Sequence, residues 1–135
     1  MIPNDQGLKE ILSKFADEYA FEGYSLTAPE SPGVCGDTPL HVAAMKNKVD
    51  LLSEMMPYVT NVDVAGDMNL TPMAAAAMFG NVEAAGYLLS CGADPFIRDE
   101  FGDLVLDKMK LKAGFEELVA SIESGGYKEA QNRGR

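Results

Sequence analysis

GDTPLHVAA occupies residues 36–44, and NLTPMAAAA occupies residues 69–77 with the same order of Thr-Pro, apolar and small positions. The two stretches lie 33 residues apart, and a further step of 33 reaches GDLVLDKMK at residues 102–110. This third copy has lost Thr-Pro but keeps the leading glycine and the leucine. Self-similarity at a fixed period of this length indicates stacked repeats, because one such unit cannot bury its apolar face alone.

The second half of each unit follows the same period. NKVDLL at residues 47–52 aligns with GNVEAA at residues 80–85, and AGFEELV at residues 113–119 holds the same place in the third unit. The stretch after Gly80 carries apolar residues at helical spacing, which predicts an amphipathic second helix. These residues are Val82, Ala85, Leu88 and Leu89.

The first half of each unit predicts a helix with a defined start. Thr38 and Thr71 are suited to cap it, and Pro39 and Pro72 fall at its first position, where a missing N–H has no cost. Alanine pairs follow in both copies, and small side chains allow neighbouring helices to approach closely. Each complete unit is therefore expected to be a pair of helices.

These motifs, together with GNVEAAGYLLSCGADP at residues 80–95, resemble the ankyrin repeat over about residues 36–122. The ankyrin pattern reads G-x-T-P-L-H-x-A-A, then G-N/H-x-E-x-V-x-x-L-L, then G-A-D. The resemblance implies that His41 is structural and forms hydrogen bonds within and between repeats. The matching positions in the later units are Ala74 and Asp107, so this series of histidines is interrupted.

The predicted fold is an all-α ankyrin-repeat solenoid with an N-terminal capping helix and a degenerate C-terminal capping repeat. Residues 1–35 are expected to form the capping helix and a loop, residues 36–68, 69–101 and 102–124 the repeats, and residues 125–135 a flexible tail. The capping helix is expected over about residues 4–21, with one apolar face. That face comprises Leu8, Ile11, Leu12, Phe15 and Tyr19.

Composition limits the function. The 135 residues include 21 acidic and 11 basic side chains, a net charge of −10, which disfavours binding to nucleic acid or to anionic membranes. The charge suits a basic protein partner, although it also fits a role in solubility alone. We expect no secretory signal from the first residues, no apolar run has membrane-spanning length, and Cys35 and Cys91 are expected to be unpaired thiols. These features favour the cytoplasm.

Catalytic and metal-binding patterns are missing from the sequence. One histidine excludes paired-histidine zinc sites, and no phosphate-binding glycine motif occurs. The loop aspartates do not have the spacing of a calcium loop. We therefore predict a protein that is not an enzyme, has no catalytic residues and requires no metal or cofactor.

The resemblance implies that partners meet the fingers, which are the turns between units, and a concave face lined by the first helices. The fingers are expected at residues 62–68 and 96–101. Phe79 and Phe101 are expected to be the main anchors, with an acidic rim around them, because aromatic residues are enriched in interface cores. The predicted partner-binding residues are Met45, Lys46, Asp63, Asp67, Met78, Phe79, Phe96, Arg98, Asp99, Glu100, Phe101, Leu111 and Lys112.

The sequence thus predicts a protein that binds another protein. The first hypothesis is a stoichiometric inhibitor that neutralises a basic toxin or enzyme, in the general manner of bacterial immunity proteins. The second is an adaptor or regulatory subunit that docks onto a cellular protein. Size, acidity and the missing catalytic groups favour the first hypothesis, but the residues do not identify the partner.

Overall fold

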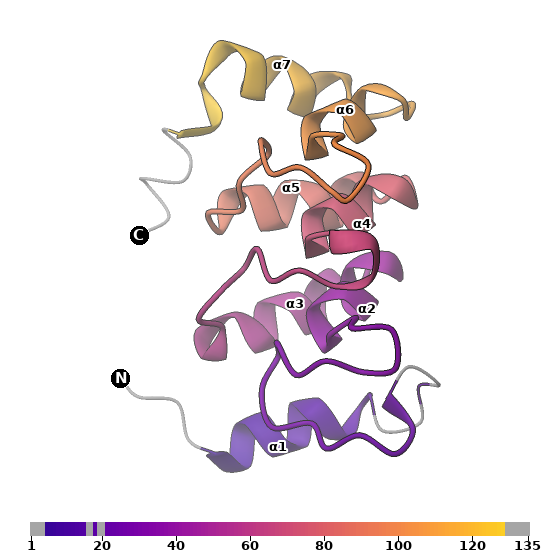
Figure 1. The fold of residues 1–135 in the computed structure, drawn as a ribbon. Helices are drawn as coiled ribbons and strands as arrows, with labels where there is room; N and C mark the ends of the chain where they lie inside the picture. The colour runs from indigo at the N-terminus through magenta and orange to yellow at the C-terminus, as the bar shows by residue number, and fades with distance from the viewer. Residues whose placement is uncertain (1–4, 16–17, 19–20, 129–135) are drawn as a thin grey trace.

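The computed structural model describes residues 5–15, 18 and 21–128 of the chain. Its helices stack in two rows (Figure 1). The inner row comprises α2 (Pro39–Met45), α4 (Pro72–Met78) and α6 (Val105–Lys110), and the outer row comprises α3 (Val49–Met55), α5 (Val82–Ser90) and α7 (Glu116–Ser124). Helix α1 (Asp5–Ser13) packs against α3 at the N-terminal end, and short 3₁₀ turns occur at η2 (Met56–Tyr58) and η3 (Asp67–Asn69).

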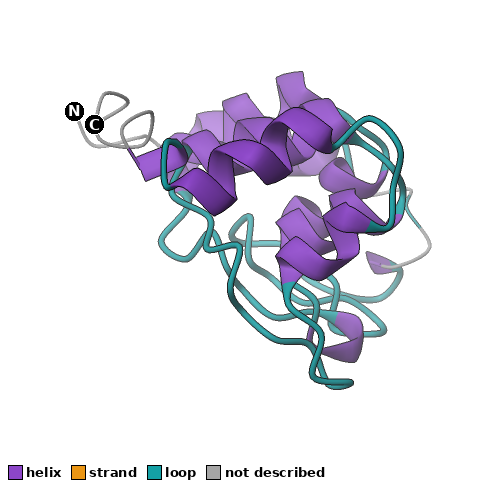
Figure 2. Ribbon diagram, turned by 90° about the horizontal axis from the view of Figure 1, so that it is seen from above, coloured by secondary structure: helices purple, strands orange, loops and turns teal. Residues whose placement is uncertain are grey.

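The two rows pack as the repeat predicts. Each inner helix contacts the next inner helix and its own outer helix, while α3 contacts α5. Seen down the stack, the loops project to one side of the helices (Figure 2). The described residues contain no strand beyond an isolated antiparallel bridge between Arg98 and Leu104. The all-α solenoid is therefore confirmed.

The predicted starts of the inner helices are also confirmed. The hydroxyl of Thr38 accepts a hydrogen bond from the amide of His41, and the hydroxyl of Thr71 accepts one from the amide of Ala74. Helix α6 lacks the Thr-Pro pair, and its start is closed by the carboxylate of Asp107, which accepts from the amide of Leu104 at 3.0 Å. Asp107 occupies the position of His41 and accepts the first amide as His41 accepts that of Thr38, so the third repeat keeps this half of the capping box without the threonine.

Repeat-to-repeat hydrogen bonds join the helix ends. The turn between α4 and α5 passes through Gly80, which has φ 73°, a left-handed conformation that glycine adopts without strain. The next residue, Asn81, donates its side-chain amide to the carbonyls of Ala44 and Met45 in the preceding repeat, at 2.9 and 2.8 Å. In return, the side-chain oxygen of Asn47 accepts from the amide of Ala84 at 3.1 Å.

The core lies between the two rows. Leu40 and Met73 from the inner row and Leu52 and Leu88 from the outer row are fully buried. Residues 43–44 and 76–77 are alanines and are also buried, so the close helix contacts predicted from these small residues occur. Because the core is packed this tightly, the removal of even one methyl group changes its packing and its stability.

Helix α1 is shorter than the predicted helix over residues 4–21. It ends at Ser13, whose hydroxyl donates to the carbonyl of Glu10. The amides of the next two residues donate to the carbonyls three residues earlier, as in a 3₁₀ turn, rather than four residues earlier. Phe15 lies beyond the helix and packs edge-to-face with Phe21, with ring centroids 6.2 Å apart. Tyr19, which was expected on the same apolar face, lies outside the described residues.

The predicted flexible tail over residues 125–135 needs a correction at its start. Gly125 caps the C-terminus of α7 with φ 83°, and Tyr127 is buried in the core. Residues 125–128 are therefore part of the packed structure. The rest of the predicted tail, residues 129–135, lies outside the described residues.

Candidate protein-binding surface

Three hairpin turns with the same geometry project from the stack, and we call them fingers 1, 2 and 3. Finger 1 (residues 33–37) is closed by the amide of Gly33 and the carbonyl of Asp37 at 2.8 Å. The equivalent bonds close finger 2 (residues 66–70) at 2.8 Å and finger 3 (residues 99–103) at 2.9 Å. The loop expected before residue 36 therefore runs into a finger with the 33-residue period.

Carboxylates tie together the segments that precede neighbouring fingers. Glu30 accepts from the amides of Thr60 and Asn61 at 2.7 and 2.8 Å, and 33 residues later Asp63 accepts from the amide of Asp94 at 3.1 Å. Burial raises the pKa of Asp63, and the hydrogen bond from Asp94 offsets this in part. Asp63 was expected in an acidic rim, but its carboxylate is half-buried and supports the stack.

His41 holds finger 2 from the preceding repeat, as the ankyrin resemblance implied. Its ring is fully buried, and Nε2 lies 2.7 Å from the carbonyl oxygen of Leu70. Because the amide of Thr38 donates to Nδ1 at 3.1 Å, Nδ1 is unprotonated and Nε2–H donates to Leu70. Burial lowers the pKa of His41, against smaller opposing effects of the Leu70 hydrogen bond and the Asp37 charge.

Asp99 was expected in the acidic rim, and this prediction is wrong because its side chain is only 2% exposed. Its Oδ1 accepts from the amides of Phe101 and Asp103 at 2.8 and 3.1 Å, and its Oδ2 lies 2.5 Å from Nζ of Lys108. Burial acts to raise the pKa of Asp99, but the Lys108 ammonium and the two amides outweigh it and lower the pKa. The side chain of Lys108 is only 13% exposed.

The tip of finger 3 presents the exposed groups that a partner can contact. The side chain of Phe101 is 69% exposed, and Glu100 beside it is also exposed. Phe96 and Arg98 are exposed before the tip, and the Arg98 guanidinium donates to the carbonyl of Gly102 at 2.6 Å. On finger 2, Asp67 is exposed, so part of the predicted rim does face solvent.

A second exposed group lies where the inner helices end. Leu111 is 83% exposed and Phe79 is 59% exposed, while Met78 is partly exposed. The lysines of this group, Lys46 and Lys112, are exposed as well, and Lys46 forms an ion pair with Glu18. Met45 is half-buried.

The structure does not bring Phe79 and Phe101 together. Each finger precedes the N-terminus of an inner helix, whereas Phe79 is the C-cap of α4. Seven helical residues separate the two ends of α4, which corresponds to about 10 Å along its axis. Residues Pro72–Ala77 of this helix are buried. The exposed side chains therefore lie at the N-terminal and C-terminal ends of the inner helices.

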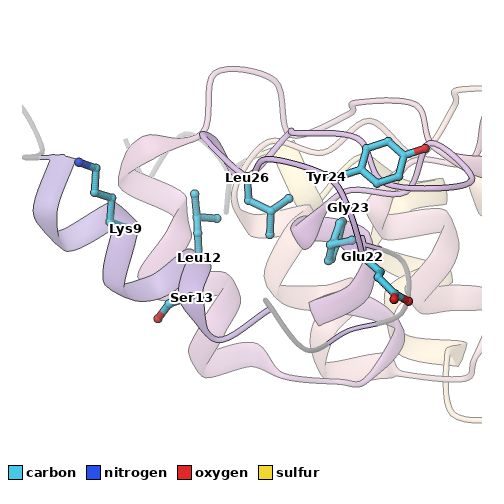
Figure 3. Close-up of a pocket in the computed structure, with 8 residues that line it drawn as sticks. Lys9, Leu12, Ser13, Glu22, Gly23, Tyr24 and Leu26 are labelled. Atoms are coloured by element: carbon cyan, nitrogen blue, oxygen red, sulfur yellow. The ribbon is translucent and has the colours of Figure 1, made fainter.

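Sequence reasoning missed a pocket of about 420 Å³ at the N-terminal end of the stack (Figure 3). Leu12 of α1, with Phe21 and Leu26 of the following segment, supplies the apolar part of its lining, and Lys9 and Glu22 supply charges. The apolar face predicted for the capping helix was the only signal for it. Within the described part of the chain, no cluster of three or more metal-binding side chains occurs, and both cysteines are free thiols.

Comparison with known proteins agrees with this architecture. The sequence matches the family described as ankyrin repeats (3 copies) over residues 6–99. The chain is 36% identical over 86 residues to the palmitoyltransferase Hip14 of Drosophila melanogaster, a match that covers 63% of this chain and 13% of that protein. It is 35% identical over 81 residues to the human palmitoyltransferase ZDHHC17, covering 59% of this chain and 12% of that protein.

A stack of helix pairs with projecting fingers is a protein-binding scaffold, and this chain belongs to the ankyrin-repeat family. The ankyrin repeat is a non-catalytic module that binds other proteins. The chain spans about an eighth of the length of the relatives it matches. No helix in the described part of the chain has the length and hydrophobicity to cross a lipid bilayer.

Proposed function

We propose that this chain captures a basic partner protein at the tips of its fingers and inhibits it stoichiometrically, as an immunity protein neutralises a toxin. The observation that carries the proposal is the exposed pair Glu100 and Phe101 at the tip of finger 3. An aromatic anchor beside a charge is the usual composition of an interface hot spot and its rim.

Charge supports a basic partner. The chain has a net charge of −10, and Asp67 and Glu100 are exposed without an ion-pair partner among the described residues. Exposed carboxylates steer a basic protein towards the surface and raise the association rate. They contribute less to the lifetime of the complex, which depends on buried anchors such as Phe101.

The exposed group at the inner helix ends extends the same proposed interface. A typical interface covers about 800 Å² on each partner, which is wide enough to bridge the roughly 10 Å between the two ends of an inner helix. We therefore keep Met78, Phe79 and Leu111 as secondary contacts, flanked by Lys46 and Lys112. Asp63 and Asp99 are withdrawn from the contact set because their carboxylates serve the fold.

The alternative is an adaptor that docks onto a cellular protein without inhibiting it. Its support is the similarity to short segments of larger palmitoyltransferases, where the matched ankyrin part is about an eighth of the protein. For either function we propose a reducing compartment such as the cytoplasm, because an exposed free thiol such as Cys35 is easily oxidised elsewhere.

Co-expression with the product of the adjacent gene tests the inhibitor. We expect that product to be toxic alone and harmless with this chain, and we expect the protection to be lost with Phe101→Ala. The matched control is Glu83→Ala on the outer face of α5, which should protect fully. A neighbouring product that is harmless alone, with a different protein recovered by affinity isolation, would favour the adaptor.

A further inference from the structure

The junction between the first and second repeats and the junction between the second and third repeats are packed with different residues at equivalent positions. In the first and second repeats, three positions near the junction hold His41, Gly66 and Ala75. One period of 33 residues later, the equivalent positions of the second and third repeats hold Ala74, Asp99 and Lys108. The histidine has become alanine, the glycine has become aspartate, and the alanine has become lysine.

The first junction leaves no room for a side chain at the finger position. A Cβ atom on Gly66 would lie 2.7 Å from Nε2 of His41 and 2.4 Å from Oδ1 of Asp37. A histidine in the preceding repeat and a side chain on the first finger residue therefore exclude each other. At the second junction, Ala74 has no ring in this place, and Ala74, Asp99 and Lys108 line one small gap together.

The second junction gives finger 3 its own internal support. Finger 2 depends on a hydrogen bond from His41 of the preceding repeat, whereas finger 3 is held by Asp99 within its own turn and by Lys108 on α6. One oxygen of Asp99 accepts the amide of Phe101, the exposed anchor, at 2.8 Å. The other oxygen is buried and faces only the ammonium of Lys108.

We propose that Asp99 and Lys108 are positioning residues for the partner-binding tip, because their buried ion pair replaces the inter-repeat histidine and presents Glu100 and Phe101 in one conformation. A preorganised anchor loses less conformational entropy on binding, so the pair raises the affinity for a partner without touching it. The binding part of this inference rests on the proposed function, whereas the positioning part does not.

Native-state hydrogen exchange measured by NMR tests the positioning directly. In Asp99→Gly, we expect the amides of Phe101 and Asp103 to exchange at least tenfold faster, because both lose the Oδ1 acceptor. The amide of Asp67 in finger 2, which donates to Asp37, is the internal control and should stay within about twofold. A uniform increase at both fingers would reduce Asp99 to a general stabilising residue and overturn the proposal.

Transplanting the first junction into the second provides a rescue. The triple variant Ala74→His, Asp99→Gly, Lys108→Ala copies the first set of residues, and its new histidine is placed to donate to the carbonyl of Asp103. We expect the triple variant to melt close to the wild type, while Asp99→Gly alone and Ala74→His alone melt well below it. A triple variant no more stable than Asp99→Gly would show that the two junctions are not equivalent.

Affinity for the isolated partner completes the test. We expect Asp99→Gly to weaken binding at least roughly tenfold, in line with the loss of an ordered anchor, and the triple variant to restore it to within about threefold. Phe101→Ala separates the two proposals. If Phe101→Ala binds like the wild type, the proposed function at finger 3 fails, while the exchange data still decide the role of Asp99. If Phe101→Ala weakens binding but Asp99→Gly does not, the inference fails alone.

Discussion

His41→Leu tests how the fingers are held, because leucine has a similar volume but no polar atoms. The replacement leaves the buried amide of Thr38, which lies 3.1 Å from Nδ1, without its acceptor, and it removes the hydrogen bond from Nε2 to the carbonyl of Leu70, which keeps its bond from the amide of Gly66. An unsatisfied buried group costs about 1–3 kcal/mol, and one lost hydrogen bond costs about 0.5–1.5 kcal/mol. The expected loss is therefore roughly 1.5–4.5 kcal/mol of unfolding free energy, a large share of the total for a small domain.

His41 also makes the stability of the fold depend on pH. Burial lowers the pKa of His41 below its ordinary value of 6.5, so the unfolded chain binds a proton at a pH where the folded chain does not. The contribution of neutral His41 to the unfolding free energy is therefore fully present above about pH 6.5, and it is lost as the pH decreases towards the lowered pKa. His41 is the single histidine of the chain, so His41→Leu should remove this dependence between pH 5 and about 6.5.

Urea unfolding monitored by circular dichroism at a series of pH values measures both effects. We expect the midpoint of the wild type to fall between pH 7 and pH 5 and that of His41→Leu to be lower but flatter. A loss below about 1 kcal/mol, or an unchanged pH slope in the variant, would refute the network and the neutral histidine that it requires.

Three further outcomes are expected. Leu88→Ala should lower the unfolding free energy by about 2–5 kcal/mol in urea titrations, because Leu88 is fully buried; an unchanged curve would mean that α5 buries another face. Gly66→Ala should cost about 1–3 kcal/mol by the same assay, because its Cβ would meet the ring of His41; a neutral variant would contradict this close contact. Asp67→Asn with Glu100→Gln should slow partner association several-fold at low salt and flatten its salt dependence, as stopped-flow measurements can show; an unchanged rate would exclude steering by these carboxylates.

The 33-residue period predicted most of the fold because it reports backbone geometry. Threonine and proline mark the helix starts, alanine pairs mark close contacts, and the leucines of α5 mark its buried face. Each of these residues marks a local feature of its own repeat, and the feature recurs in the next repeat at the same position. The second helices and the exposure of Phe101 followed from the same register, whereas the hairpin turns of fingers 2 and 3 begin four and three residues after the predicted starts at residues 62 and 96.

Side-chain orientation at the repeat junctions could not be read from the motif. Asp99 occupies the first position of finger 3, and its burial goes with a small residue 25 positions earlier and a lysine nine positions later. The three substitutions are visible in the sequence at a spacing of 33, but the ion pair between Asp99 and Lys108, on which their proposed compensation rests, is seen only in the packing. The end of α1 was missed for a similar reason, since its apolar spacing continues past Ser13 while its backbone does not.

The measurement that tests the central claim most directly is the dissociation constant of the isolated partner for the wild type, Phe101→Ala and Glu83→Ala by surface plasmon resonance. Phe101 stands 69% exposed at the tip of finger 3, whereas Glu83 lies on the outer helix α5. We predict that Phe101→Ala weakens binding by roughly 2 kcal/mol or more, about thirtyfold, and that Glu83→Ala leaves it within about twofold. Equal losses in both variants, or full affinity in Phe101→Ala, would contradict recognition through the fingers.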